Sequence, residues 1–139
     1  MSTSFTTTRR VDFRDTDAAG IMHFSVFFTA MESAETEFLR SRGLSVIMHD
    51  PAGEIGWPRV SVRCDYKSPV RFEDEYQIAV RTTRIGGKSV TYEFTFTHDD
   101  RQVAVGEMTS VCCRMNDAAP ISIPIPDWIL LRLRGESSG

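Results

Sequence analysis

The residues best suited to chemistry lie close together near the start of the chain, in the run DTDAAG over residues 15–20, just ahead of a long helical pattern. The first turn of a helix leaves backbone N–H groups unpaired and carries partial positive charge, so it can hold a developing oxyanion. Gly20 would let the backbone approach a ligand closely. A carboxylate of this loop could attack a carbonyl carbon, or direct a water to it, while N–H groups near His23 and Phe24 hold the carbonyl oxygen. The pattern therefore fits acyl transfer.

The same two aspartates also have a purely structural interpretation. Asp15 and Asp17 could accept hydrogen bonds from nearby backbone N–H groups and so shape the turn. The D-x-D spacing also admits a bound metal ion, an alternative that chelator-sensitive activity would support. His49 and His98 have no spacing that would assemble a metal site, and we expect no metal.

A single long helix must position this loop. Apolar residues recur at spacings of three and four, which predicts a helix over residues 23–42 with one aromatic face buried, and Gly43 is suited to follow its last turn. The first members of that face, Phe27 among them, could also line an acyl pocket. The residues of the apolar face are Phe24, Phe27, Phe28, Met31, Ala34 and Phe38.

Beyond the helix the apolar pattern changes to period two, which is typical of strands with one apolar face. Gly86-Gly87 indicates a hairpin turn between two of them. A helix followed by an antiparallel meander predicts an α+β fold in which a sheet wraps around one long central helix. The outer face and edges of that sheet would remain free to pair with a second copy, so a homodimer is expected. The expected elements besides the helix are strands over 6–14, 60–67, 76–80, 90–96 and 102–115, and a short closing helix over 124–134.

Two glutamates complicate the helix pattern. Glu35 falls between Phe28 and Phe38 on the apolar face, and Glu32 sits near the edge of that face. An unpaired buried charge is costly, so Glu35 must be paired, exposed to water at a pocket or a dimer seam, or protonated. Either glutamate could serve the substrate pocket or could be the partner of an arginine.

The composition of the 139 residues, 41% hydrophobic and 25% charged, fits one globular domain over residues 1–134 with a disordered tail over 135–139. A formal net charge of −3 with no basic stripe argues against nucleic acid as a partner. Three cysteines without C-x-x-C spacing indicate neither a disulfide framework nor a zinc site, which fits the cytoplasm. No apolar run is long enough for a signal peptide or a membrane span.

The sequence VDFRDTDAAGIM over residues 11–22, followed on the helix by Phe27 and Met31-Glu32, resembles the hotdog-fold thioesterases of the 4-hydroxybenzoyl-CoA thioesterase family. The resemblance implies a hotdog fold, an acyl-CoA substrate, Asp17 as the catalytic carboxylate and backbone N–H groups near Phe24 as the oxyanion site. It also implies a site between two subunits. Many members have a histidine followed by Asn-Tyr ahead of the helix, whereas this chain has His23-Phe24, which puts a catalytic part for this histidine in doubt.

These observations together predict a cytoplasmic acyl-CoA thioesterase that forms a homodimer, or a dimer of dimers, and needs no cofactor besides the CoA of its substrate. We expect Asp17 to be catalytic, with Gly20, His23 and Phe24 forming the oxyanion loop. The expected substrate-binding residues are Phe27, Met31, Glu32 and Glu35. Two alternatives stay open: a hotdog hydratase or dehydratase that uses His23 and Glu35 as acid and base, and a non-catalytic acyl-thioester binding protein.

Overall fold

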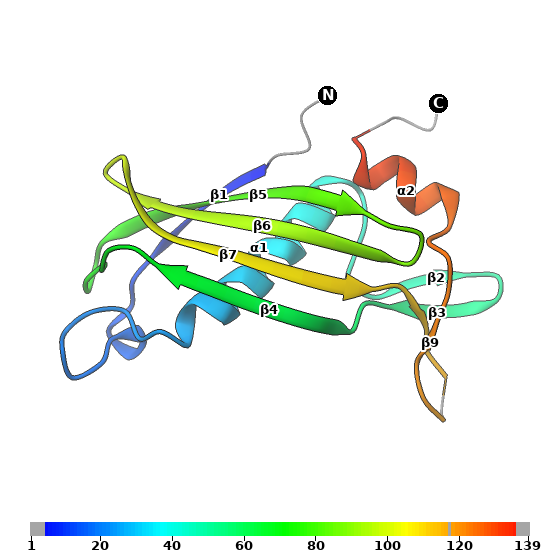
Figure 1. Cartoon of the computed structure of the whole chain (residues 1–139), viewed down its shortest axis with the longest axis horizontal. Coiled ribbons are helices and arrows are strands. Elements are labelled where there is room, and N and C mark those ends of the chain that lie inside the picture. Colours follow the sequence, from blue (N-terminus) through cyan, green and yellow to red (C-terminus); the bar gives the residue numbers. More distant parts are fainter. Residues whose placement is uncertain (1–4, 117, 136–139) are drawn as a thin grey trace.

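The computed structural model describes residues 5–116 and 118–135, and in this part of the chain one long helix lies across a five-stranded sheet (Figure 1). The helix is α1 (Val26–Ser41), and the strand order in the sheet is β1-β5-β6-β7-β4, with every neighbouring pair antiparallel. The strands are β1 (Phe5–Arg10), β4 (Arg59–Tyr66), β5 (Glu75–Ile85), β6 (Ser89–His98) and β7 (Arg101–Val111).

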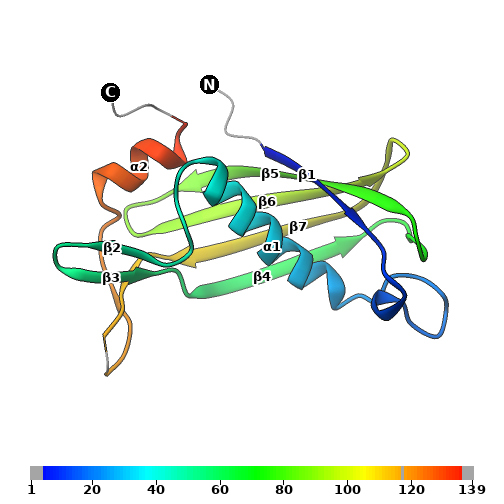
Figure 2. The same ribbon diagram turned by 180° about the vertical axis from the view of Figure 1, so that it is seen from behind.

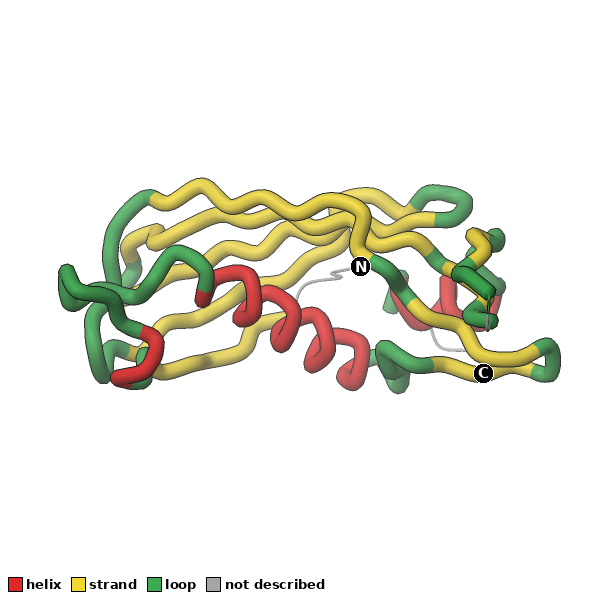
Figure 3. The backbone as a smooth tube through the Cα atoms, turned by 90° about the horizontal axis from the view of Figure 1, so that it is seen from below, coloured by secondary structure: helices red, strands yellow, loops and turns green. Residues whose placement is uncertain are grey.

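The core forms where the apolar face of the sheet meets the apolar face of α1. Every second residue of β6 from Val90 to Phe96 is buried, as the period-two pattern predicts. The helix crosses the sheet on this inner face (Figure 2), and the sheet curves around it when viewed from below (Figure 3). A fully buried side chain such as Phe38 contributes roughly 1.5–3 kcal/mol to stability. The buried residues of α1 are Phe27, Ala30, Met31, Ala34, Glu35, Phe38 and Leu39.

The C-terminal end of α1 is closed by the glycine that the sequence suggested. Gly43 has a φ of +75°, its N–H donates to the carbonyl of Arg40 (3.0 Å), and the N–H of Leu44 donates to the carbonyl of Leu39 (2.8 Å). This pair of bonds is a Schellman motif, which satisfies carbonyls that the helix end would leave unpaired.

The N-terminal end of α1 differs from the prediction, because the helix begins at Val26 and not at residue 23. The preceding residues are held by the rest of the fold, since the N–H of Met22 donates to the carbonyl of Val70 (2.8 Å) and that of His23 donates to the carbonyl of Asp15 (2.8 Å). The first strand is likewise shorter than expected. It ends at Arg10, and residues Phe13–Asp15 form a 3-10 helix.

A second, smaller sheet was missed by the sequence prediction. It has the order β2-β3-β8-β9, and it forms because the predicted strand over 102–115 breaks at Cys112. The Arg114 guanidinium binds both carboxylate oxygens of Asp50 (2.7 and 3.1 Å) and so joins β8 to the hairpin of β2 and β3. Its strands are β2 (Met48–Asp50), β3 (Gly53–Gly56), β8 (Cys113–Arg114) and β9 (Ile121–Ser122).

The closing helix is confirmed as α2 (Asp127–Leu133), and it buries Ile129 and Leu133. Gly135 belongs to the turn after it, and its N–H donates to the carbonyl of Arg132 (3.0 Å). The remaining residues of the expected tail, 136–139, lie outside the described residues.

At the open edge of the main sheet, the pairing of β4 with β7 shifts register between Arg59 and Ser61. A curved antiparallel sheet around one long central helix is the hotdog arrangement, so the expected α+β fold is confirmed.

Candidate active site

The loop that carries Asp17 is a compact turn held by its own backbone. The N–H of Asp17 donates to the carbonyl of Ile21 (2.9 Å), and the N–H of Gly20 donates to the carbonyl of Asp17 (2.9 Å). Gly20 has a φ of +80°, a conformation that glycine adopts without strain. One carboxylate oxygen of Asp17, Oδ1, accepts the N–H of Ala19 (2.8 Å). The structural interpretation of Asp17 therefore holds for one of its two oxygens.

The other oxygen of Asp17, Oδ2, has no hydrogen-bond donor among the residues that the structure describes. Asp15 differs, because its Oδ2 accepts the N–H of Asp12 (3.0 Å) and its carbonyl accepts the N–H of His23. The two aspartates of the D-x-D pair are thus used separately, and in the described residues no group of three or more His, Cys, Asp or Glu side chains could hold a metal ion.

Asp17 lines a hollow of about 350 Å³ between the loop, the start of α1 and the end of β4. Its walls are mostly apolar, so a carboxylate there lies in a setting that an acyl group could enter. Of the predicted site residues, Asp17, Phe24 and Phe27 line this hollow, whereas Gly20, His23, Met31, Glu32 and Glu35 do not. The complete lining is Asp17, Ile21, Met22, Phe24, Phe27, Tyr66, Lys67, Ser68 and Pro69.

The amide groups ahead of α1 are mostly used by the fold. The N–H groups of Gly20 and His23 donate to the carbonyls of Asp17 and Asp15, so neither is free for a ligand. The N–H of Ser25 donates to Nδ1 of His23 (3.2 Å). The N–H of Phe24, by contrast, has no acceptor in the described part of the chain. Phe24 is therefore the one member of the predicted oxyanion loop whose amide is available.

The hydroxyl of Tyr66 was not anticipated from the sequence. It donates to the carbonyl of Phe24 (3.0 Å), and its ring lies edge-on to Phe27 with centroids 5.1 Å apart. Tyr66 and Lys67 lie at the end of a predicted strand. The alternation of apolar and polar residues there indicates only which face of the strand is apolar, and it gives no sign of a contact with Phe24, 42 residues earlier in the chain.

The seam between α1 and β4 continues from this hollow to the two helix glutamates. A second hollow of about 230 Å³ lies along it, and Glu32 and Arg59 stand side by side there, 3.6 Å apart. Glu32 is 58% exposed. The residues that line this second hollow are Phe28, Thr29, Glu32, Arg59, Val62 and Met108.

Glu35 has the arginine partner that its position required. Its side chain is 1% exposed, Oε1 accepts a hydrogen bond from Arg59, and Oε2 accepts one from the hydroxyl of Ser110 (3.3 Å). Burial raises the pKa of this carboxyl above its ordinary 4.5, while the charge of Arg59 acts in the opposite direction. Neither Glu35 nor His23 lines the hollow at Asp17 or the hollow at Glu32, so neither of these two hollows brings together the acid and base of the hydratase alternative. Met31 is fully buried in the core.

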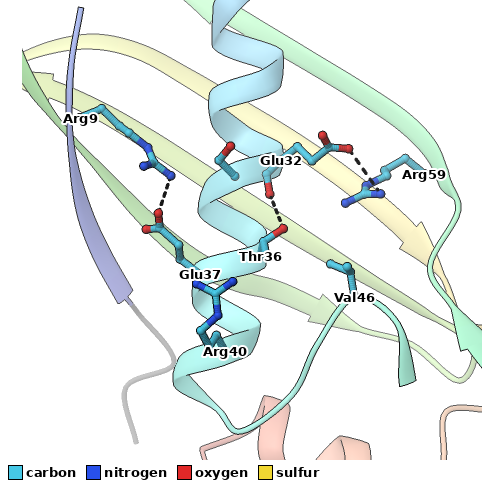
Figure 4. Close-up of a pocket in the computed structure, with 8 residues that line it drawn as sticks. Arg9, Glu32, Thr36, Glu37, Arg40, Val46 and Arg59 are labelled. Carbon is cyan, nitrogen blue, oxygen red and sulfur yellow. Dashed lines mark hydrogen bonds and ion pairs between the residues drawn. The ribbon is translucent and has the colours of Figure 1, made fainter. Parts of the chain in front are cut away.

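A polar hollow of about 480 Å³ lies over the exposed face of α1 (Figure 4). Ion pairs form its walls, with Arg9 2.5 Å from Glu37 and Arg59 3.6 Å from Glu32. Asp17 is not part of it. The smaller hollow at Asp17 has mostly apolar walls, and among the described residues Oδ2 of Asp17 and the N–H of Phe24 have no hydrogen-bond partner.

Comparisons with known proteins bear on the family and on the class of reaction. Residues 11–133 match the model of the family described as the thioesterase-like superfamily. A putative esterase of Aquifex aeolicus is 31% identical over 84% of this chain and 88% of its own length. A 1,4-dihydroxy-2-naphthoyl-CoA hydrolase of Synechococcus sp. is 29% identical over 87% of this chain and 86% of its own.

Solved structures give the same picture. The structure of a gentisyl-coenzyme A thioesterase superposes with a TM-score of 0.79 at 28% identity, covering 93% of this chain and 99% of the other.

In the described residues, no helix is both long and apolar enough to span a bilayer.

Proposed function

Because the chain belongs to the thioesterase-like superfamily and is a thioester hydrolase, we propose that it hydrolyses acyl-CoA thioesters with the carboxylate of Asp17. One observation carries the assignment of Asp17. This carboxylate residue and Phe24, whose N–H has no acceptor among the described residues, line the same largely apolar hollow. The proposal uses no metal or redox cofactor, and CoA enters as part of the substrate.

In the proposed mechanism the N–H of Phe24 donates to the thioester oxygen and stabilises the negative charge that develops on it. The Asp17 carboxylate either attacks the carbonyl carbon, giving an acyl anhydride that water then opens, or removes a proton from a water that attacks directly. In both routes the C–S bond breaks and water supplies the new C–O bond. A CoA thiol resembles cysteine, with a pKa near 8.5, so its thiolate can leave without a strong general acid.

We propose a hydroxylated aromatic acyl group as the substrate class. The relatives named above act on 1,4-dihydroxy-2-naphthoyl-CoA and gentisyl-CoA, and the hollow of this chain has aromatic walls from Phe24, Phe27 and Tyr66. Glu32 and Arg59 stand about two helical turns along the seam, where they could bind the ring hydroxyls. The narrower 4-hydroxybenzoyl-CoA family stays a prediction, because these two relatives are named for other aromatic acyl groups.

We also propose that the active form is a homodimer joined along β4. This strand is an edge of the main sheet, and its side chains Val60 and Val62 are 61% and 46% exposed. An exposed apolar edge strand is a template for pairing with another chain. A second copy in that position would close the open side of the seam and contribute a wall to the acyl pocket. A dimer of dimers and a cytoplasmic location stay predictions.

Replacing Asp17 by Asn tests the catalytic assignment. The side-chain oxygen of Asn can still accept the N–H of Ala19, so the turn is kept while the negative charge is lost. We expect kcat for thiol release to fall by about 10²- to 10⁴-fold with the fold intact. The matched control is Asp15→Asn. It removes the charge of a carboxylate that lies two residues from Asp17 and serves only the turn, so this variant should retain most activity.

A panel of aromatic, short, medium and long acyl-CoAs completes the test. Near-normal turnover by Asp17→Asn would remove this residue from the mechanism. Consumption of an enoyl-CoA without thiol release would favour the hydratase alternative, and tight binding of an acyl-CoA without any turnover would favour a binding protein.

A further inference from the structure

We infer that Tyr66 is a positioning residue that holds the amide of Phe24 in place for the substrate. The inference rests on the proposed function and adds to it a residue from β4, far from the catalytic loop in sequence. It stands on one hydrogen bond and one aromatic contact: the Tyr66 hydroxyl donates to the carbonyl of Phe24 (3.0 Å), and the Tyr66 ring packs edge-on against Phe27.

Hydrogen bonds hold the two peptide units that flank Phe24. The unit before it is held at its carbonyl, because the N–H of Val26 donates to the carbonyl of His23 (3.0 Å). The unit after it is held at both ends, by the Tyr66 hydroxyl at the Phe24 carbonyl and by Nδ1 of His23 at the N–H of Ser25 (3.2 Å). The N–H of Phe24 is the one group of these two peptide units that makes no such hydrogen bond. Its direction is therefore set by the bonds that hold the other groups.

Tyr66 supplies the only one of these bonds that comes from outside the loop and the helix start. Removing it would free the carbonyl of Phe24 to turn toward water, and the amide of the same residue would lose part of its fixed orientation. An oxyanion donor is effective when it is already aimed at the developing charge. The bond is therefore expected to matter more in the transition state than in substrate binding.

The hydroxyl is suited to act as a donor at any pH at which the enzyme would be assayed. Burial raises the pKa of the Tyr66 phenol above its ordinary 10.0, so the group stays protonated. The Tyr66 side chain also lines the hollow, which means that the ring and the hydroxyl can be tested apart.

The test is Tyr66→Phe, which keeps the ring against Phe27 and deletes the hydroxyl. With the best acyl-CoA of the panel, we expect kcat to fall about three- to tenfold while KM changes less than twofold. The control is Tyr76→Phe, which deletes a hydroxyl from a buried ring stacked on Phe96 in the core and should leave kcat unchanged.

Two non-hydrolysable CoA analogues sharpen the test. A ketone analogue with a methylene in place of sulfur keeps the carbonyl oxygen that the Phe24 amide would bind, whereas a thioether analogue lacks that oxygen. Tyr66→Phe should weaken binding of the ketone about two- to fivefold and leave binding of the thioether unchanged.

Several results would overturn the inference. A variant with unchanged kcat, a raised KM with unchanged kcat, or a lowered melting temperature without loss of kcat would each mean that Tyr66 only packs or binds. Equal effects on the ketone and the thioether would mean the same. If the wild-type protein releases no thiol from any acyl-CoA, the proposed function itself fails, and this inference fails with it.

Discussion

The buried pair of Glu35 and Arg59 predicts an unequal cost for the loss of its two members. Glu35 is 1% exposed, whereas the Arg59 side chain is 30% exposed. Arg59→Met leaves a carboxylate buried without its cation, which costs about 3–5 kcal/mol of unfolding free energy at neutral pH. Glu35→Gln leaves a guanidinium that water can still reach, so we expect a smaller cost of about 1–2 kcal/mol.

The cost of losing Arg59 should also depend on pH. Burial holds the pKa of the folded Glu35 carboxyl above its ordinary 4.5, against the charge of Arg59. A carboxyl whose pKa is raised by folding contributes stability that is fully present below the unfolded pKa and is lost as pH rises through the folded pKa. Removing Arg59 raises the folded pKa further. The deficit of Arg59→Met relative to the wild type should therefore be smaller at pH 5 than at pH 8.

Urea unfolding followed by tryptophan fluorescence measures these differences, since Trp57 is buried. The double variant Glu35→Gln with Arg59→Met removes both charges and should be more stable than Arg59→Met alone. The reasoning is refuted if Arg59→Met is no less stable than Glu35→Gln at pH 8, or if its deficit is the same at pH 5 and pH 8.

Two further predictions concern the core and the thiols. Gly106→Ala places a methyl group against the sulfur of Met31, so overpacking should lower the free energy of unfolding by about 1–3 kcal/mol in thermal unfolding. The control Gly87→Ala adds a methyl group that meets nothing within 4 Å, so its stability should stay within about 0.5 kcal/mol of the wild type. Equal melting temperatures for the two variants would contradict this packing. Burial raises the pKa of the Cys64 and Cys112 thiols to about 11. Alkylation of these two cysteines at pH 8 should be much slower in the folded protein than in urea, as read by mass spectrometry, and similar rates in both states would argue against their burial.

The helix and the main strands could be predicted because each repeats a pattern over many residues. The spacing of three and four gave most of the buried face of α1, but Phe24, which it included, lies ahead of the helix and is 60% exposed. Period two gave the positions of β4 to β7. The small sheet was missed because β8 and β9 have only two residues each, too few for any period. The start of α1 was misplaced because Met22 and His23 are held by bonds to Val70 and Asp15, which no helical pattern records.

The candidate site divides in the same way. Asp17 and Phe24 could be singled out, because a carboxylate loop ahead of a helix has a recognisable chemistry. The need of Glu35 for a partner could also be anticipated, since a charge on an apolar face must be compensated. That the partner is Arg59, 24 residues away, and that Tyr66 reaches Phe24 depend on how β4 lies beside α1, and only the assembled fold specifies this.

The edge strand β4 is held near both of its ends, by a bond from Arg59 to Glu35 of α1 and by a bond from Tyr66 to the carbonyl of Phe24 just ahead of α1. Inserting or deleting one residue between these fastenings would displace one of them by about 3.3 Å and turn the intervening side chains to the opposite face. The irregularity after Arg59 is where the strand already carries an unmatched residue. Redesign of the acyl pocket for a longer or shorter ring system thus has a natural adjustment point there, away from the catalytic loop.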